Sequence, residues 1–442
     1  MSSPLHSPRL RRILVAYTVN RLGTWIGLVA LSVAVFDHTH NALAVAAFLL
    51  AWEALPAFVV PAVVARIEVS KRRGALSGLY FFEAVLTTLL AVVLWHFSLP
   101  LLLLLAVLDG TAALTANSLL RAEVARAASD QAAEELHDAA GQHEPPVATS
   151  QAARHLNDDA KQAERKANAA LNVASSTSFV LGPAFGGVVV AVAGPSAALF
   201  IDVATFLLCG ALLVDLHPYV ELAAGDSVRA RLRAAWDHIT ERSALLELLL
   251  VEAAALIFFE AGGPIEVAYA KATLHAGDRG FGLLLTMWGV GGVLGSLVFA
   301  RLVRRPLGGM LTAGAFLVGA AYLALAVVPT LALACVAAVV GGIGNSLQFP
   351  SLVSVVQWRT PRHLHGRLMG VVESLGSLSV AIGFPLGGAL VALSTTRIAF
   401  LVVGVGALLT MAALMRLWLY TGTFEPPAAD GGREPATDAP LA

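Results

Sequence analysis

The chain has 442 residues, of which 57% are hydrophobic and only 13% are charged, and its formal net charge is -1. A soluble domain carries about 25% charged residues, so this composition excludes an ordinary soluble enzyme and predicts a membrane protein that crosses the bilayer several times. Both cysteines, Cys209 and Cys335, lie in apolar runs. Because they offer no metal-ligand spacing, we predict buried thiols, no metal site and no cofactor.

Twelve apolar stretches are long enough to span a membrane, which takes about 20 residues in a helix. The first stretch follows Arg9, Arg11 and Arg12 and contains Arg21, so it predicts a retained spanning helix rather than a cleaved signal peptide. The seventh, which carries glutamates, and the tenth, which ends in polar residues, are the least regular. The predicted spans are residues 12–36, 42–65, 74–96, 99–120, 170–193, 196–216, 244–268, 281–303, 308–328, 330–356, 367–393 and 396–419.

Three polar segments lie between or after these spans. Residues 127–167 are alanine-rich and contain a Pro-Pro pair, which predicts a long cytoplasmic loop, with two short helices that break at the prolines. Residues 217–243 form the middle linker, whose second part is an arginine-bearing amphipathic helix on the membrane surface rather than a nucleic-acid site. The tail, residues 421–442, is rich in proline and acidic residues and is expected to be disordered.

The basic residues predict the orientation of the chain. With the N-terminus in the cytoplasm, 25 of the 29 Lys and Arg residues fall on the cytoplasmic side, and only Lys271, Arg279 and Arg397 fall on the other. Cytoplasmic loops carry such an excess of positive charge. We therefore expect both termini to be cytoplasmic and the number of spans to be even.

The sequence repeats itself after about 200 residues. NVASSTSFVLGPAFGG at 172–187 aligns with ESLGSLSVAIGFPLGG at 373–388, so the fifth span resembles the eleventh. A weaker match sets AVLDG at 106–110 against AVVGG at 338–342, in the fourth and tenth spans. Six spans repeated from the same side predict two six-helix halves, residues 1–216 and 244–420, joined by the linker.

The order of segments resembles the major facilitator superfamily, and within it the bacterial exporter branch that includes enterobactin exporters and macrolide efflux proteins. RRILVAYTVNRLGTWIGLVALSVAVFDHT is similar to the family's first span and LLAWEALPAFVVPAVVAR to its second. The resemblance covers nearly the whole chain except residues 127–167 and the tail. It implies an all-α membrane protein with twelve transmembrane helices. GPAFGG matches the family's motif C, which is associated with exporters and antiporters.

The resemblance also implies a cytoplasmic latch after the second span, where the family has Gly, Asp, Gly and basic residues. This chain reads VARIEVSKRR at 64–73, with Glu68 in the place of the Asp and Arg72 and Arg73 as the basic end. Val64 and Lys71 replace the glycines. The latch prediction therefore rests on Glu68, Arg72 and Arg73.

Charged side chains inside a membrane are costly and are functional candidates by default. We select Arg21, Glu53, Asp109 and Glu260 as proton-coupling or cavity charges. The resemblance implies that spans one, four, seven and ten line the cavity, which favours Arg21, Asp109 and Glu260. Either Asp109 or Glu53 could exchange a proton as its contact with Arg21 is made and broken. The alternative is a static pair that makes the burial of Arg21 tolerable.

Polar and aromatic residues at helical spacing complete the predicted cavity. Thr24 and Trp25 share a face with Arg21, Asn117 shares a face with Asp109, and Asn345 and Gln348 lie together in the tenth span. Such a mostly apolar wall suits an amphipathic organic molecule better than a sugar.

The motif SFVLGPAFGG is interpreted as a hinge and packing seam rather than a phosphate loop, because apolar sequence flanks it on both sides. A proline inside a helix frees one backbone hydrogen bond and can bend the helix, and glycines let a second helix approach closely. The residues of the two copies are Gly182, Pro183, Gly186, Gly187, Gly383, Pro385, Gly387 and Gly388.

Together these features predict a monomeric exporter in the bacterial inner membrane, not an enzyme, that moves a hydrophobic or amphipathic small molecule outward in exchange for protons. Two alternatives stay open. One is a lipid or lysophospholipid flippase on the same fold. The other is a transport-inactive sensor or scaffold that uses residues 127–167 as its partner surface.

Overall fold

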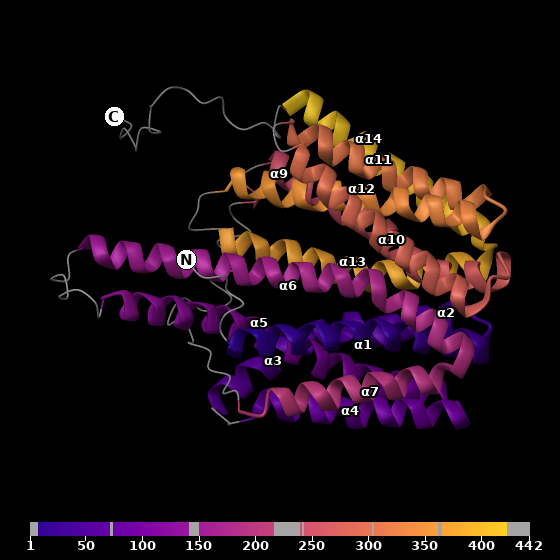
Figure 1. Ribbon diagram of the computed structural model, residues 1–442. Helices are drawn as coiled ribbons and strands as arrows, with labels where there is room; N and C mark the ends of the chain where they lie inside the picture. The colour runs from indigo at the N-terminus through magenta and orange to yellow at the C-terminus, as the bar shows by residue number, and fades with distance from the viewer. Residues whose placement is uncertain are drawn as a thin grey trace.

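The computed structural model describes residues 8–70, 74–140, 150–215, 239–240, 243–302, 305–360 and 365–421. Every element within these ranges is helical, and twelve long helices run side by side (Figure 1). Eleven of them are long and apolar enough to cross a membrane. The twelfth, α9, carries four glutamates and is the irregular seventh span of the sequence. The predicted all-α, twelve-helix fold is confirmed.

The first half contains six of the twelve helices. Its second span is one continuous helix built from α2, a π-helical turn η2 and α3, and its third span ends in the short turn η3. The elements are α1 (Pro8–Thr39), α2 (Ala42–Leu49), η2 (Leu50–Ala54), α3 (Leu55–Ser70), α4 (Ala75–Val93), η3 (Leu94–His96), α5 (Leu99–Ala140), α6 (Ser150–Ala193) and α7 (Pro195–Leu212).

The second half contains the other six, and its first span ends in a second π-helical turn, η4. The elements are α9 (Ser243–Ala268), η4 (Tyr269–Thr273), α10 (Gly277–Arg301), α11 (Leu307–Val327), α12 (Leu331–Trp358), α13 (His365–Leu393) and α14 (Thr396–Thr421).

The polar segment 127–167 differs from the expected separate loop. Helix α5 continues to Ala140 and α6 begins at Ser150, so most of the segment extends the fourth and fifth spans. Alanine has the highest helix propensity, which explains why the helices do not stop where the apolar sequence stops. The Pro-Pro pair, most of the middle linker and all but the first residue of the tail lie outside the described residues.

Apolar cores show how the halves meet. We call the end of the bundle where α1 begins the near end and the end where α1 finishes the far end. Toward the far end a single core joins both halves, with Val29 and Phe48 from the first and Ile265 and Phe400 from the second. Toward the near end each half has its own core, one around Tyr17 and one that includes Leu311 and Leu414. The halves are therefore packed together at the far end and separate at the near end.

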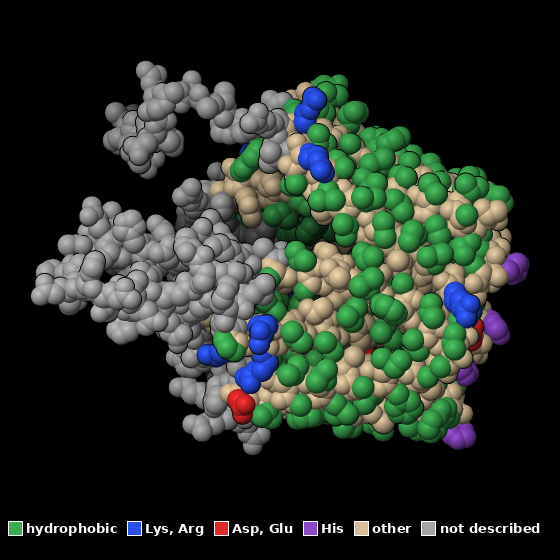
Figure 2. Space-filling view, in the orientation of Figure 1, with side chains coloured by type: hydrophobic (Ala, Val, Ile, Leu, Met, Phe, Trp, Pro, Cys, Tyr) green, Lys and Arg blue, Asp and Glu red, His purple; other side chains and the backbone are tan. Residues whose placement is uncertain are grey.

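The outer surface agrees with this arrangement. Hydrophobic side chains cover the lateral face in Figure 2, Lys and Arg gather toward its two ends, and a recess opens between the halves toward the near end. Phe58, Trp95 and Leu393 are among the large apolar side chains that are more than 60% exposed. Apolar surface of this extent requires lipid around it.

The far end is closed by two helix pairs in which glycines permit close approach. Helix α6 packs on α10, where a Cβ atom on Gly187 would lie 3.0 Å from the Cα of Gly282. Helix α13 packs on α2, where a Cβ atom on Gly388 would lie 3.0 Å from the Cα of Leu43. The two glycines are equivalent in the sequence repeat. Both copies of the motif therefore supply the contact between the halves.

The residue before each of these glycines packs inside its own half. Gly186 faces Ile26 on α1, and Gly387 faces Ala261 on α9. In each copy of the motif, the first glycine of the pair thus contacts the first helix of its own half, and the second glycine contacts the opposite half. This double contact explains why the motif needs adjacent glycines.

The weaker sequence repeat, AVLDG at 106–110 and AVVGG at 338–342, also packs in the same way in both halves. Gly110 on α5 lies against the backbone carbonyl of Trp52, and Gly342 on α12 lies against that of Trp288. Each half therefore packs a glycine of its fourth helix against a tryptophan of its second.

An ion bridge joins the halves at the far end. The Nζ atom of Lys271 lies 2.5 Å from Asp37 Oδ1 on α1 and 2.5 Å from Asp278 Oδ1 on α10. The lysine side chain is only 13% exposed. Asp37 is 44% exposed, so the bridge is partly open to solvent, and its opposite charges favour contact between α1 and the second half.

We predict that Lys271→Ala weakens closure of the far end, because Asp37 and Asp278 then lose their shared cation. Spin labels at Asn41 and Ser394, both exposed at that end, should show a longer mean distance by pulsed electron paramagnetic resonance.

The labels require a background in which Cys209 and Cys335 are replaced by alanine. Arg279→Ala is the matched control, because this arginine is exposed at the same end and forms no ion pair among the residues that the structure describes. An unchanged distance in Lys271→Ala would contradict the bridging role.

We also predict that Gly187→Ala destabilises the protein, because the added methyl group meets the backbone of Gly282. Overpacking of this kind costs about 1–3 kcal/mol, and the thermal midpoint of the purified protein should fall. Gly376→Ala on α13 is the control, because a Cβ atom there meets nothing within 4 Å. Equal midpoints for the two variants would refute the close contact.

Candidate functional site

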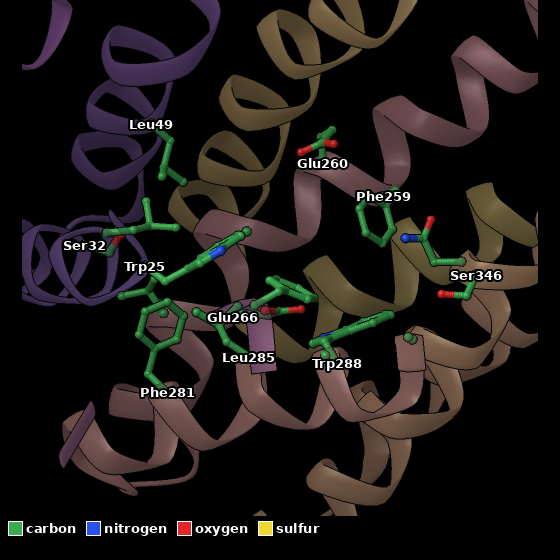
Figure 3. A pocket seen from close by; sticks show the side chains of 18 of the residues that line it. Trp25, Ser32, Leu49, Phe259, Glu260, Glu266, Phe281, Leu285, Trp288 and Ser346 are labelled. Carbon is green, nitrogen blue, oxygen red and sulfur yellow. The ribbon is translucent and has the colours of Figure 1, made fainter. Parts of the chain in front are cut away.

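A cavity of about 450 Å³ lies between the halves, and we call it the chamber (Figure 3). The first half contributes α1, α2 with η2, and α6, and the second contributes helices α9 to α13. The lining residues are Trp25, Leu28, Ser32, Leu49, Glu53, Ser176, Phe179, Phe259, Glu260, Gly263, Glu266, Val267, Phe281, Leu285, Trp288, Gly289, Gly292, Val293, Ser296, Tyr322, Gly342, Asn345, Ser346 and Phe384.

Aromatic rings make up much of the wall. The ring centroids of Trp25 and Phe179 lie 4.7 Å apart in the first half. In the second half, Trp288 lies 5.7 Å from Tyr322 and 5.9 Å from Phe259, measured between ring centroids. These contacts hold the rings in fixed positions, so the wall is preformed.

Trp288 occupies its position because glycines make room for it. A Cβ atom on Gly341 would collide with the indole ring, and Gly342 lies against the Trp288 carbonyl. The glycines of AVVGG in α12 therefore make room for the side chain of Trp288 on α10.

A π-helical turn places the first carboxylate, Glu53. Pro56 has no backbone N–H and so cannot bond to the carbonyl of Trp52, four residues earlier. The helix widens here, and the N–H of Leu55 bonds to the carbonyl of Leu50 instead. The freed Trp52 carbonyl faces Gly110, and Glu53 lies in the chamber wall.

Two further carboxylates come from α9 and lie on either side of Pro264. Glu260 precedes the proline and Glu266 follows it, and both line the chamber. The Tyr322 hydroxyl donates a hydrogen bond of 2.9 Å to the Phe259 carbonyl, which anchors this part of α9 to α11. Glu266 is only 5% exposed and lies beside Trp288 in Figure 3.

In the part of the chain that the structure describes, no basic side chain balances these three acids inside the chamber. None of the described lining residues is Lys, Arg or His. Among the described residues, no basic group lies within 4 Å of the carboxylates of Glu53, Glu260 or Glu266. The chamber is therefore an apolar, aromatic space with acidic groups on two sides.

The structure brings four of the sequence-predicted site residues to the chamber, namely Trp25, Glu53, Glu260 and Asn345. Arg21 does not line it. The guanidinium Cζ lies 5.8 Å from the centroid of the Trp25 ring, behind the wall. Arg21 forms no ion pair within the described part of the chain, although its charge acts on Glu53 over a longer distance.

Asp109 and Thr24 lie inside the first half, away from the chamber. Asp109 accepts hydrogen bonds of 3.2 Å from the indole N–H of Trp52 and from the hydroxyl of Thr87. It shares a much smaller pocket with Thr24 and Asp202. The expected contact between Arg21 and Asp109 is not formed in this conformation.

The two other predicted amide side chains, Gln348 and Asn117, lie in different surroundings. Gln348 donates a hydrogen bond of 2.9 Å to Glu252, and both line a small pocket next to the chamber together with Asn345. Asn117 is half-buried on α5 and is not among the lining residues. Of the predicted latch, Arg72 and Arg73 and the side chain of Glu68 lie outside the described residues.

The motif residues support the chamber from behind. Gly182 lies against Trp25, and its counterpart Gly383 lies against Glu260 and the backbone carbonyl of Ile257. Pro183 and Pro385 lie inside α6 and α13, as predicted for spanning helices. The motif thus positions chamber side chains, a role that sequence reasoning did not assign to it.

Glu266 is the main residue that sequence reasoning missed. The predicted seventh span ended at 268, which put Glu266 at the membrane edge. The structure continues through η4 to Thr273, so Glu266 lies inside the bundle. Its distance of only two residues from Pro264 was the available signal, because a proline within a membrane helix often marks a binding region.

Comparison with known proteins agrees with the fold. Residues 248–441 match the family model described as Major Facilitator Superfamily. The multidrug efflux pump Tap of Mycobacterium tuberculosis is 27% identical over 263 residues, and so is Tap of Mycobacterium bovis. That match covers 57% of this chain, and the chain spans 61% of the length of these relatives.

Solved structures of low sequence identity share the fold. The nucleoside transporter NupG superimposes with a TM-score of 0.69 at 12% identity, over 94% of this chain and 100% of that one. A bacterial homologue of the iron transporter ferroportin, in an inward-facing state, gives a TM-score of 0.63 at 16% identity, over 92% of this chain and 98% of that one.

Within the described ranges, twelve long helices, eleven of them apolar enough to cross a membrane, surround a central chamber, and this fold is shared with solved transporters of low sequence identity. The sequence of residues 248–441 is similar to the major facilitator superfamily.

Proposed function

We propose that this protein is a secondary active exporter that moves a hydrophobic or amphipathic small molecule across the bacterial inner membrane by proton antiport. The observation that carries the proposal is the chamber itself, an apolar space between two halves that are packed together at only one end. The similarity to the efflux pump Tap supports export rather than uptake.

The direction of opening follows from the distribution of charge. If the loops rich in Lys and Arg are cytoplasmic, the near end faces the cytoplasm and the far end faces outward. The conformation described here is then open inward, where an exporter takes up its cargo. Rocking of the halves about the chamber would open the far end and break the ion bridge of Lys271.

Proton coupling is assigned to the chamber carboxylates and to Asp109. Glu53 and Glu260 come from opposite halves and interact electrostatically as like charges. Two carboxylates that face each other across the chamber repel each other unless one of them takes up a proton or a cation lies between them. Proton binding at this pair therefore depends on how far apart the halves stand, which is what alternating access requires.

We predict that Glu53→Gln and Asp109→Asn each lower gradient-driven transport at least tenfold. The measurement is the uptake of fluorescent dyes into inside-out proteoliposomes under an imposed pH gradient, with a protonophore abolishing the wild-type signal. Glu247→Gln is the matched control on α9, because this glutamate is exposed outside the chamber.

Wild-type rates in both variants would refute the proton-carrier role. Movement of labelled lipid alone, without any dye, would favour a flippase. No transport of any small molecule or lipid would favour a sensor or scaffold.

A further inference from the structure

We infer that the chamber is a binding site for a lipophilic organic cation, with the positive charge of the ligand held at Glu266 and its apolar body between the rings of Trp25 and Trp288. The inference rests on the proposed function in that it takes the chamber as the substrate path. It adds the chemical class of the substrate, which neither the fold nor the efflux relatives specify.

The charge of the lining is the first argument. Among the described lining residues, three carboxylates face the chamber and no basic side chain does. An anionic ligand would meet these carboxylates without a compensating cation, so Coulomb repulsion opposes its binding. A monovalent cation instead supplies the charge that the lining lacks.

The three carboxylates are not equivalent. Glu53 interacts with the positive charge of Arg21, which lies behind the wall, and also with Glu260 across the chamber. Glu266 has neither neighbour. The nearby Lys271 is bound to Asp37 and Asp278 at the far end. Glu266 is 5% exposed and lies beside the indole of Trp288, so at this acid a carboxylate and an aromatic ring meet in the chamber wall.

The rings are the second argument. The faces of Trp and Tyr attract cations, and Trp does so most strongly. Trp288 lies beside Glu266, and Trp25 lies across the chamber from it in Figure 3. Apart from the indole N–H groups of Trp25 and Trp288, the uncharged polar groups of the described lining are four serines, Asn345 and the Tyr322 hydroxyl, which already donates to the Phe259 carbonyl. These are too few groups to hydrogen-bond a sugar, so charge and apolar surface must supply the affinity.

The test compares three aryl probes on the purified full-length protein, two of which have the same shape and opposite charge. The probes are tetraphenylphosphonium, which is a cation, triphenylphosphine oxide, which is neutral, and tetraphenylborate, which is an anion. Binding is followed by isothermal titration calorimetry and by quenching of tryptophan fluorescence. We expect the cation to bind at least tenfold more tightly than the other two probes.

Glu266→Gln should remove most of this preference, with at least a tenfold loss of affinity for tetraphenylphosphonium and little change for triphenylphosphine oxide. Glu247→Gln on the same helix should bind like the wild type. Unchanged elution and thermal midpoint show that each variant is folded. If Glu266→Gln does not fold, the comparison of cation with anion on the wild-type protein decides the inference without any variant.

Equal or tighter binding of tetraphenylborate, no binding of tetraphenylphosphonium, or equal affinities in Glu266→Gln and Glu247→Gln would overturn the inference. The outcome is separable from that for export. Cation binding without transport would leave the inference standing and refute the exporter, whereas proton-driven efflux of neutral or anionic dyes without cation binding would do the reverse.

Discussion

The close approach of α6 to α10 and of α2 to α13 is the contact on which the rest of the structure depends. Gly187 meets the backbone of Gly282, and Gly388 meets that of Leu43, so no side chain separates the helices at the far end. Membrane helices gain little from the hydrophobic effect in lipid and associate through packing of this kind. Toward the near end each half has its own apolar core, so the halves diverge there and enclose the chamber.

The acids of the chamber depend on irregular backbone. A regular α-helix bonds each N–H to the carbonyl four residues earlier, and prolines or π-helical turns change that pattern around each acid. Pro56 with η2 sets the position of Glu53, and Pro264 lies between Glu260 and Glu266. Such departures from ideal helix geometry are frequent at functional sites. Some helices therefore both hold the halves together and carry the acids. Movement of the halves changes the distance between the acids.

Much of the fold could be predicted from the sequence, because span length and the internal repeat are local signals. The glycine motif was interpreted as a hinge and packing seam, and in the structure Gly187 and its partner at a shift of 201 residues, Gly388, both lie close to the opposite half. The site was harder to predict. Asp109 lies on a helix expected to line the cavity, yet it turns toward Trp52 and Thr87 inside the first half. Glu266 was overlooked because the end of a span cannot be read from hydropathy when a π-helical turn continues it.

The most direct measurement is the accessibility of a single cysteine placed in the chamber wall. In a protein in which Cys209 and Cys335 are replaced by alanine, Ser346→Cys lies in the chamber, and Asn41→Cys lies at the far end. A membrane-impermeant thiol reagent should modify position 346 of the resting protein in sealed vesicles only from the near-end side, and position 41 only from the other side. Modification of position 346 from the far-end side alone, or equally from both sides, would contradict a chamber that is closed where the glycines meet.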